Sequence, residues 1–278
     1  MAVRFHEDGH IYESVDVIEN IPWISVTSLV SQFKEPFDGN KQALNSSRNR
    51  KSKWYKLPVE EILEVWQAET IRSNTLGTWY HKERETDLMA CESIERYGKA
   101  VPIFKPIYEN GVKIAPEQRL VEGIYPEHLV YSKVFGVCGQ VDRADVIDWV
   151  LDIDDYKTNK EIKKTSYKNW EGNSKRLMSP LLHLEDCHIV HYGLQLSMYA
   201  YMIIKHNPQI TVGKLNLKHV IFEEEGRDKY DNPITKLDHN KNPIVKDVVP
   251  LQVPYYKREV ELIFEWLKNN RDKIRKKT

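Results

Sequence analysis

Alternating apolar and polar positions run through the middle of the chain and predict a series of strands. The clearest alternation lies at residues 103–108, 117–124, 130–146, 149–158 and 215–223, with turn-forming residues between the runs. In an extended strand, side chains two residues apart share a face, so Leu151, Ile153 and Asp155 point to the same side. A turn near Asp148 would pair the third and fourth runs as a hairpin. That pairing would bring Asp142 close to Asp155 at the far end of the second strand.

Apolar positions at helical spacing predict helices elsewhere in the chain. The predicted helices cover residues 27–34, 58–72, 75–97, 189–205 and 255–275. Pro58 is suited to the first turn of the second helix. The fourth helix is apolar nearly all round, so we expect it to be buried.

The remaining segments predict turns and loops. Residues 4–12 indicate a hairpin around Asp8-Gly9, and a short strand is expected at 23–26. Residues 159–185 are polar and irregular, which suggests a functional loop over a site. The pairs Asn232-Pro233, Asn242-Pro243 and Val253-Pro254 indicate a further loop region.

These elements predict an α/β fold with a mixed central β-sheet flanked by helices. We expect one domain over residues 1–278. Within it, residues 1–75 form an N-terminal hairpin and helical elaboration, 76–225 form the core, and 226–278 form a loop and the C-terminal helix.

The composition excludes a disordered chain and a strong electrostatic field from net charge. Charged residues make up 29% and aromatic residues 10% of the 278 positions, and the 41 basic and 41 acidic residues cancel. Binding to nucleic acid would therefore depend on local basic patches. One candidate is the segment 48–56, RNRKSKWYK, which interleaves cations with aromatic rings. The basic tail at 271–277 is at least as well explained as a helix end, where lysines complement the helix dipole.

The cysteines and the apolar runs indicate a cytoplasmic protein without a membrane segment. Cys91, Cys138 and Cys187 are an odd number, which favours a reducing compartment. The N-terminal residues lack the apolar stretch of a signal peptide. The longest apolar run, at 196–204, is about half as long as a membrane-spanning helix.

Candidate chemistry is concentrated between Gly139 and Thr158. The predicted hairpin places Asp142 on one strand and Asp155 with Lys157 at the end of the next. Two carboxylates and an ammonium group that converge at a strand end suit a hard divalent cation and a phosphodiester. This arrangement indicates a nuclease.

Four motifs in this part of the chain resemble the PD-(D/E)XK nuclease superfamily in its RecB-type form. Gly139–Asp142 (GQVD) lies thirteen residues before Asp155–Thr158 (DYKT), and the pair is similar to the core signature of that family. Gly77–His81 resembles the Gly-Thr-x-x-His start of a family helix, and Gln195–Tyr199 matches the Gln-x-x-x-Tyr helix. The motifs span residues 77 to 199 in the family's order.

The resemblance implies a restriction-endonuclease-like core and a set of site residues. In such a site, Mg²⁺ or Mn²⁺ is held by His81, by the carboxylates of Asp142 and Asp155, and by the backbone carbonyl of Tyr156. Lys157 would act with the two acids in catalysis, either as a base or as a ligand of the phosphate.

Two further parts of the site follow from the same resemblance. Gln195 and Tyr199 would approach the catalytic lysine and the DNA backbone. An additional acid is expected upstream of the GQVD motif, and Glu117 fits that position better than Glu122. Asp154 alternates onto the other face of its strand, and would be a supporting acid at most.

Each of these residues also has a purely structural interpretation. Asp142 could form a salt bridge with Arg143, Lys157 could be a surface lysine, and Tyr199 could be a core tyrosine capped by Gln195. The occurrence of all four motifs in the family's order favours the catalytic interpretation.

The sequence therefore predicts a Mg²⁺- or Mn²⁺-dependent deoxyribonuclease. It would hydrolyse DNA from ends or as single strands during recombination, repair or replication, like the stand-alone nucleases of phages and mobile elements. No cysteine follows Cys187, so the iron–sulfur cluster of some relatives is not expected, and no nucleotide-binding Gly-x-x-x-x-Gly-Lys motif is present. Expected partners are DNA and a separate helicase, recombinase or single-strand-binding protein. The alternatives are a structure-specific or restriction-type endonuclease, and an inactive nuclease fold that binds DNA or a protein.

Overall fold

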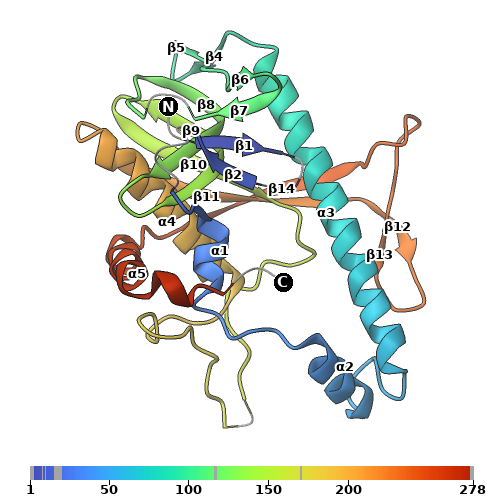
Figure 1. Ribbon diagram of the computed structural model, residues 1–278. Helices are drawn as coiled ribbons and strands as arrows, with labels where there is room; N and C mark the ends of the chain where they lie inside the picture. Colours follow the sequence, from blue (N-terminus) through green and yellow to red (C-terminus); the bar gives the residue numbers. More distant parts are fainter. Residues whose placement is uncertain are drawn as a thin grey trace.

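A mixed β-sheet lies at the centre of the structure, which is a computed structural model (Figure 1). The structure describes residues 3–7, 9, 11–15, 21–115, 118–169 and 171–275. The six strands of the central sheet are β3 (Ile24–Ser25), β8 (Gly123–Ser132), β9 (Val137–Ile147), β10 (Val150–Lys157), β11 (Thr211–Phe222) and β14 (Val245–Val253). Their order is β14-β11-β10-β9-β3, and β8 also pairs with β9. The predicted α/β class with a mixed central sheet is therefore confirmed.

Among the described residues, three smaller sheets and five α-helices surround the central sheet. A four-stranded sheet contains β1 (Val3–His6), β2 (Ile11–Ser14), β6 (Ile107–Glu109) and β7 (Val112–Ile114). The two hairpins are β4 (Ser93–Arg96) with β5 (Lys99–Pro102) and β12 (Glu224–Arg227) with β13 (Pro233–Thr235). The helices are α1 (Val26–Ser31), α2 (Gly39–Arg48), α3 (Val59–Met89), α4 (His188–His206) and α5 (Lys257–Asn270), followed by a short 3₁₀ turn, η1 (Arg271–Lys273).

The predicted hairpin between the two central strands is confirmed. β9 and β10 pair antiparallel, from Val150 opposite Ile147 to Asp154 opposite Arg143. Asp148 and its successor Trp149 both have positive φ values, 50° and 60°, as a tight two-residue turn between twisted strands requires. β11 then returns parallel to β10, so the chain must cross over the sheet between them, and α4 lies in that connection.

α4 is the buried helix that its sequence predicts. It packs with α1 and α5 on one face of the central sheet and forms the main hydrophobic core with them. Leu194, Leu196 and Met198 are fully buried there. Each such side chain contributes about 1.5–3 kcal/mol through removal of its surface from water.

The predictions for the N-terminal helices were wrong in three respects. Residues 59–89 form one continuous helix, α3, where two helices over 58–72 and 75–97 were expected. The helix ends at Met89, and residues 93–102 form the β4–β5 hairpin, in whose turn Tyr97 and Gly98 take positive φ values. α2 was not predicted; Asp38 caps it by accepting a hydrogen bond from the backbone N–H of Lys41 at 3.0 Å.

Four strand predictions also need correction. The runs 103–108 and 117–124 are not continuous strands, because residues 104–106 and 118–122 belong to no strand and only the ends of these runs lie in β6 and β8. Residues 130–146 do not form one strand, because a turn at 133–136 separates β8 from β9. The predicted loop region after residue 226 contains β12, β13 and β14. β14 lies at the edge of the sheet. Pro250 can be tolerated there, because on one side of an edge strand no neighbouring strand needs a backbone N–H donor.

Other local predictions agree with the structure. β1 and β2 form the expected N-terminal hairpin, although Asp8 itself lies outside the described residues. The described residues of 159–185 contain isolated bridges but no helix or longer strand. In the part of the chain that the structure describes, no helix combines the length and the apolar character needed to cross a membrane.

Candidate metal centre

The end of the β9–β10 hairpin brings Asp142 and Tyr156 together. The backbone N–H of Tyr156 donates a hydrogen bond to Asp142 Oδ2 at 2.7 Å, which fixes the carboxylate of Asp142 on the sheet. His81 of α3 reaches the same place. Its Nδ1 lies 3.5 Å from Asp142 Oδ1, and its Nε2 lies 3.3 Å from the carbonyl oxygen of Tyr156. Three of the predicted metal ligands are thus neighbours.

Gly77 allows α3 to approach the strand that carries these groups. A Cβ atom at this position would lie 3.1 Å from Thr158 Oγ1, closer than most side-chain contacts. Thr158 Oγ1 also donates to the carbonyl oxygen of Ser73, at 3.3 Å, one turn earlier on the helix. The glycine of the Gly77–His81 motif therefore has a physical reason: it lets the helix pack against the DYKT segment and so positions His81.

A further acid, Glu127, lies next to His81 and Asp142. The preferred candidate, Glu117, lies outside the residues that the structure describes, and its competitor Glu122 is exposed at the start of β8. Glu127 is buried on β8. One ligand atom from each of His81, Glu127 and Asp142 lies within 4.8 Å of the other two.

The strand register explains both the position of Glu127 and why it was missed. Pro126 pairs with Arg143 and His128 pairs with Val141, so Glu127 lies opposite Asp142. The prediction of an unbroken strand over 130–146 concealed this hairpin. Had the turn at 133–136 been recognised, counting back from it along the partner strand would have pointed to Glu127.

Glu127 is held in a strained and charged environment. Its φ is +50°, which is uncommon for a residue other than glycine, and backbone strain of this kind within a strand is typical of functional sites. Gln140 Nε2 donates a hydrogen bond to its carboxylate, and Lys113 Nζ lies 3.8 Å from Oε2. Burial, and then the negative charge of Asp142, raise the pKa of Glu127 well above its usual range.

These residues fit a hard divalent cation. The donor set combines an imidazole, two carboxylates and the backbone carbonyl of Tyr156, a mixture that suits Mn²⁺ and, through its oxygen atoms, Mg²⁺. A dication between Glu127 and Asp142 would also offset the repulsion that raises the pKa of the buried glutamate. Lys113 and Gln140 are parts of this site that the sequence did not indicate.

Asp155 lies beside this cluster, in contact with Lys157. The ammonium Nζ of Lys157 is 2.5 Å from Asp155 Oδ2, and Gln195 Nε2 donates to Asp155 Oδ1 at 3.3 Å. Burial raises the pKa of Asp155 to about 6, against the opposing effect of Lys157. Burial alone would lower the pKa of Lys157, but Asp155 and Asp142 together raise it. Lys157 is therefore a cation in this geometry, suited to hold an anionic oxygen.

Tyr199 connects the α4 motif to the GQVD motif. Gln195 Nε2 donates to Tyr199 Oη at 3.2 Å, so the amide of Gln195 lies between the phenol and Asp155. The ring of Tyr199 rests on Gly139, where a Cβ atom would lie only 2.5 Å from Tyr199 Cε1. The glycine of GQVD thus makes room for the tyrosine of the Gln-x-x-x-Tyr helix.

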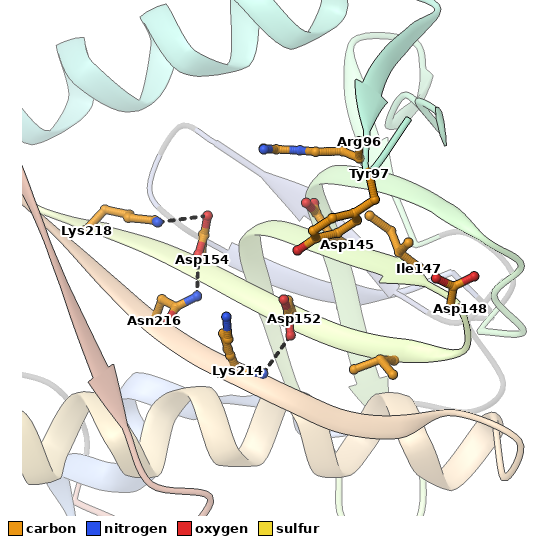
Figure 2. A pocket seen from close by; sticks show the side chains of 11 residues that line it. Arg96, Tyr97, Asp145, Ile147, Asp148, Asp152, Asp154, Lys214, Asn216 and Lys218 are labelled. Atoms are coloured by element: carbon orange, nitrogen blue, oxygen red, sulfur yellow. Dashed lines mark hydrogen bonds and ion pairs between the residues drawn. The ribbon is translucent and has the colours of Figure 1, made fainter. Parts of the chain in front are cut away.

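Asp152 and Asp154 face away from this cluster, as strand alternation predicts. Both line a separate cavity of about 380 Å³ on the other side of β10 (Figure 2). The backbone N–H of Lys214 donates to Asp152 Oδ1 at 2.6 Å, and Asp154 accepts from Asn216 Nδ2 at 2.9 Å. Lys218 Nζ lies 3.5 Å from Asp154. Asp154 is therefore neutralised by β11 rather than by the candidate centre.

Comparison of the chain with models of known protein families, with curated proteins and with solved structures gave no match. The function of the site is therefore inferred from its own geometry and from the motifs.

Proposed function

We propose that this protein is a divalent-metal-dependent DNA exonuclease built on a restriction-endonuclease-like core of the PD-(D/E)XK type. The observation that carries the proposal is the convergence of His81, Glu127 and Asp142, with the ion pair of Asp155 and Lys157 at their side. Helix α3 supplies His81, strand β8 supplies Glu127, and the β9–β10 hairpin supplies the other three groups. Burial of several charged groups is costly, and such groups with perturbed pKa values are concentrated at functional sites.

Each residue has a defined part in the proposed reaction. A bound Mg²⁺ or Mn²⁺ ion would stabilise negative charge on the phosphate and lower the pKa of a coordinated water. Lys157 would hold the attacking water or a phosphate oxygen, and Asp155 keeps the ammonium group in place. Gln195 fixes the orientation of Asp155 through its hydrogen bond. The enzyme would bind a DNA end or a single strand, and a separate helicase or recombinase would separate the strands.

The proposal is tested by incubation of the purified protein with linear, nicked and covalently closed circular DNA, single- and double-stranded. We expect linear strands to be degraded with Mg²⁺ or Mn²⁺, closed circles to survive, and activity to disappear in excess chelator. The protein should be colourless, without the absorption of an iron–sulfur cluster. Cutting of closed circles at discrete positions would establish an endonuclease instead. A lack of cleavage with either metal would support an inactive fold.

The hydrogen bonds of Gln195 give a second prediction. Gln195→Met keeps the side-chain length but removes the donor to Asp155, so cleavage should fall by about 100-fold through misplacement of the site. Tyr199→Phe keeps the ring on Gly139 and removes only the oxygen that accepts from Gln195, so a loss of severalfold at most is expected, with a stability change of about 1 kcal/mol.

The measurement is turnover on single-stranded DNA beside a thermal melt of each variant. A catalytic role predicts that the rate for Gln195→Met falls much further than its melting temperature explains. Rate losses that only follow the melting temperatures in both variants would assign this helix face to the core.

A further inference from the structure

Four aromatic rings form a connected row where α2 meets the first half of α3. Ring centroids are 6.2 Å apart between Phe37 and Trp66, 6.2 Å between Trp66 and Trp54, and 5.8 Å between Trp54 and Tyr230. We call these four residues the aromatic corner. Phe37 at its outer end is 74% exposed, while the others are half-buried. α2 lies beside the first turns of α3, at the end of this helix remote from the central sheet (Figure 1).

Cations accompany these rings. Lys53 Nζ lies 4.6 Å from the centre of the Trp54 ring, and Lys229 Nζ lies 4.5 Å from that of Tyr230. The segment 48–56 holds five basic residues and no acidic residue, in a chain whose charges balance overall. Aromatic rings interleaved with lysine and arginine bind single-stranded nucleic acid, because the rings stack on bases and the cations contact phosphates.

A cavity opens beside Phe37 and Trp66, the first two rings of the row. It has a volume of about 380 Å³, enough for a nucleobase, and Phe37 and Trp66 form its aromatic walls. Its remaining lining is mainly polar and consists of Gln42, Ser46, Val65, Glu69 and Asn232. Amide, hydroxyl and carboxylate groups can pair with the edge of a base, but only when that base is not already paired in a duplex.

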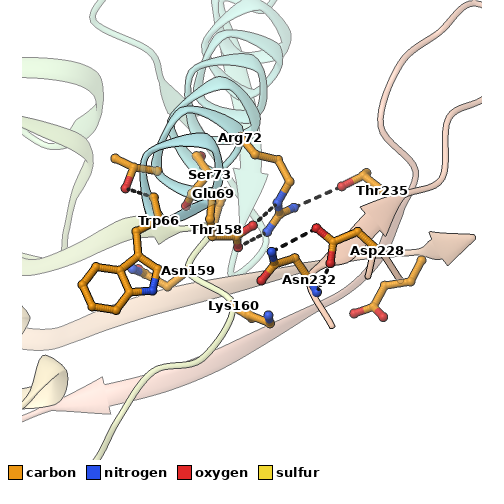
Figure 3. A network of polar contacts seen from close by, with 12 residues as sticks. Trp66, Glu69, Arg72, Ser73, Thr158, Asn159, Lys160, Asp228, Asn232 and Thr235 are labelled. Carbon is orange, nitrogen blue, oxygen red and sulfur yellow. Dashed lines mark hydrogen bonds and ion pairs between the residues drawn. The ribbon is translucent and has the colours of Figure 1, made fainter. Parts of the chain in front are cut away.

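The chain that leaves the candidate metal centre runs towards this corner. Thr158, directly after Lys157, is hydrogen-bonded to α3, and Lys160 Nζ donates to the carbonyl oxygen of Asp231 next to Tyr230. Figure 3 shows Thr158, Asn159 and Lys160 beside the stretch of α3 that begins at Trp66.

The length of α3 sets the spacing between the two places. Trp66 lies fifteen residues before His81 on this one helix, which corresponds to about 22 Å along its axis. A strand with about 3.4 Å between nucleotides covers that distance with roughly seven nucleotides, and a more extended strand needs fewer.

We infer that the aromatic corner is an anchoring site for single-stranded DNA, in which an unpaired base enters the cavity and packs against Phe37 and Trp66. This inference rests on the proposed nuclease function, because that function places the other end of the bound DNA strand at His81 and Lys157. The basic segment 48–56 contacts the phosphates on either side of the inserted base. The anchor holds the strand while its end is processed at the metal centre.

Binding is tested first in excess chelator, so that no cleavage takes place. The probe is a fluorescein-labelled oligothymidine of about fifteen nucleotides, long enough to cover both places, and its affinity is measured by fluorescence anisotropy. Phe37→Ala should weaken binding by about 10-fold, the scale expected for loss of one base–aromatic stack. Tyr97→Ala is the matched control, because Tyr97 is an equally exposed aromatic residue on the β4–β5 hairpin, and it should bind like the wild type. Trp66→Ala should weaken binding at least as much as Phe37→Ala.

A blunt duplex of the same length should bind more weakly than the single strand. In the presence of Mg²⁺, Phe37→Ala should slow cleavage of the long strand. Cleavage of a trinucleotide should keep its wild-type rate, because a trinucleotide at the metal centre is too short to reach the aromatic corner. Wild-type affinity in Phe37→Ala, or a duplex bound as tightly as the single strand, would overturn the anchor and leave the nuclease proposal intact. Conversely, Phe37-dependent binding without any cleavage would support the anchor and overturn the nuclease.

Discussion

Replacement of Lys157 by methionine should lower the rate of DNA cleavage by on the order of 100-fold or more, because it removes the positioned cation of the site. The ammonium group of Lys157 lies 2.5 Å from Asp155 Oδ2, in the cluster next to Asp142. Affinity for DNA should change much less, since most contacts to a nucleic acid are made to phosphates elsewhere. The measurement is single-turnover cleavage of linear DNA, with binding followed separately in chelator.

The variant will also lose stability, and this loss has to be separated from the loss of activity. Removal of one partner of a buried ion pair costs about 3–5 kcal/mol, because the other charge remains buried without compensation. The double variant Lys157→Met with Asp155→Asn removes both charges. It should regain much of the stability and none of the activity. Recovery of cleavage in the double variant would show that Lys157 serves the fold and not the reaction.

The pH dependence of stability gives an independent check on the same pair. In the folded protein burial already raises the pKa of Asp155 to about 6, and without the opposing charge of Lys157 the pKa should rise further. A carboxyl group whose pKa is higher in the folded than in the unfolded chain causes stability to fall as the pH rises from the unfolded to the folded pKa. The deficit of Lys157→Met, measured without metal, should therefore be larger at pH 8 than at pH 4.

Asp154→Asn is the matched control for Asp155→Asn. The two acids are neighbours in sequence but lie on opposite faces of β10, and Asp154 is paired with Asn216 and Lys218 of β11. Asp155→Asn should abolish most cleavage, and Asp154→Asn should leave the rate within a few-fold of the wild type. The reverse result would mean that the wrong face of the strand has been assigned to the site.

Local pattern was sufficient to predict the part of the site that depends on one hairpin. Alternation in β10 determines which of its four acidic and basic side chains face the core, and the turn at Asp148 aligns Asp142 with Tyr156. α4 was equally predictable, because a helix that is apolar all round can only be buried. These features follow from neighbours in sequence, where strand and helix periodicity act directly.

The remaining parts depend on contacts between distant segments. Lys113 reaches Glu127 from β7, a strand of a different sheet, and no local pattern indicates that pairing. α3 continues through Ser73 and Asn74, residues that favour a break, because its carbonyl at Ser73 and its buried Leu76 are held by the tertiary structure. Glu127 was missed because the turn between β8 and β9 was not predicted at residues 133–136. Its position follows only when β8 and β9 are recognised as separate strands.

Glu127→Gln should abolish the tight binding of Mn²⁺ while leaving the shape of the site unchanged. The substitution keeps the size of the side chain but removes one of the two carboxylates that lie within reach of His81. Loss of a ligand should weaken metal binding by about 100-fold or more, above the 10–100-fold range seen for residues that only support ligands. Cleavage at a fixed Mg²⁺ concentration should fall at least in proportion.

The readout is the rise in melting temperature that Mn²⁺ produces. An ion present at a hundred times its Kd stabilises the folded state by about 2.7 kcal/mol, and a 100-fold weaker site retains only about 0.4 kcal/mol at the same concentration. Because each variant is compared with itself with and without metal, the altered contacts of Glu127 with Lys113 and Gln140 do not affect the result.

Glu122→Gln is the matched control, because this exposed acid directly precedes β8 and does not belong to the group of His81, Glu127 and Asp142. It should keep the full metal-induced shift and the full cleavage rate. A normal shift in Glu127→Gln would remove Glu127 from the metal centre. If the shift disappears in Glu122→Gln instead, the register between β8 and β9 that places Glu127 opposite Asp142 cannot be the one that forms the site.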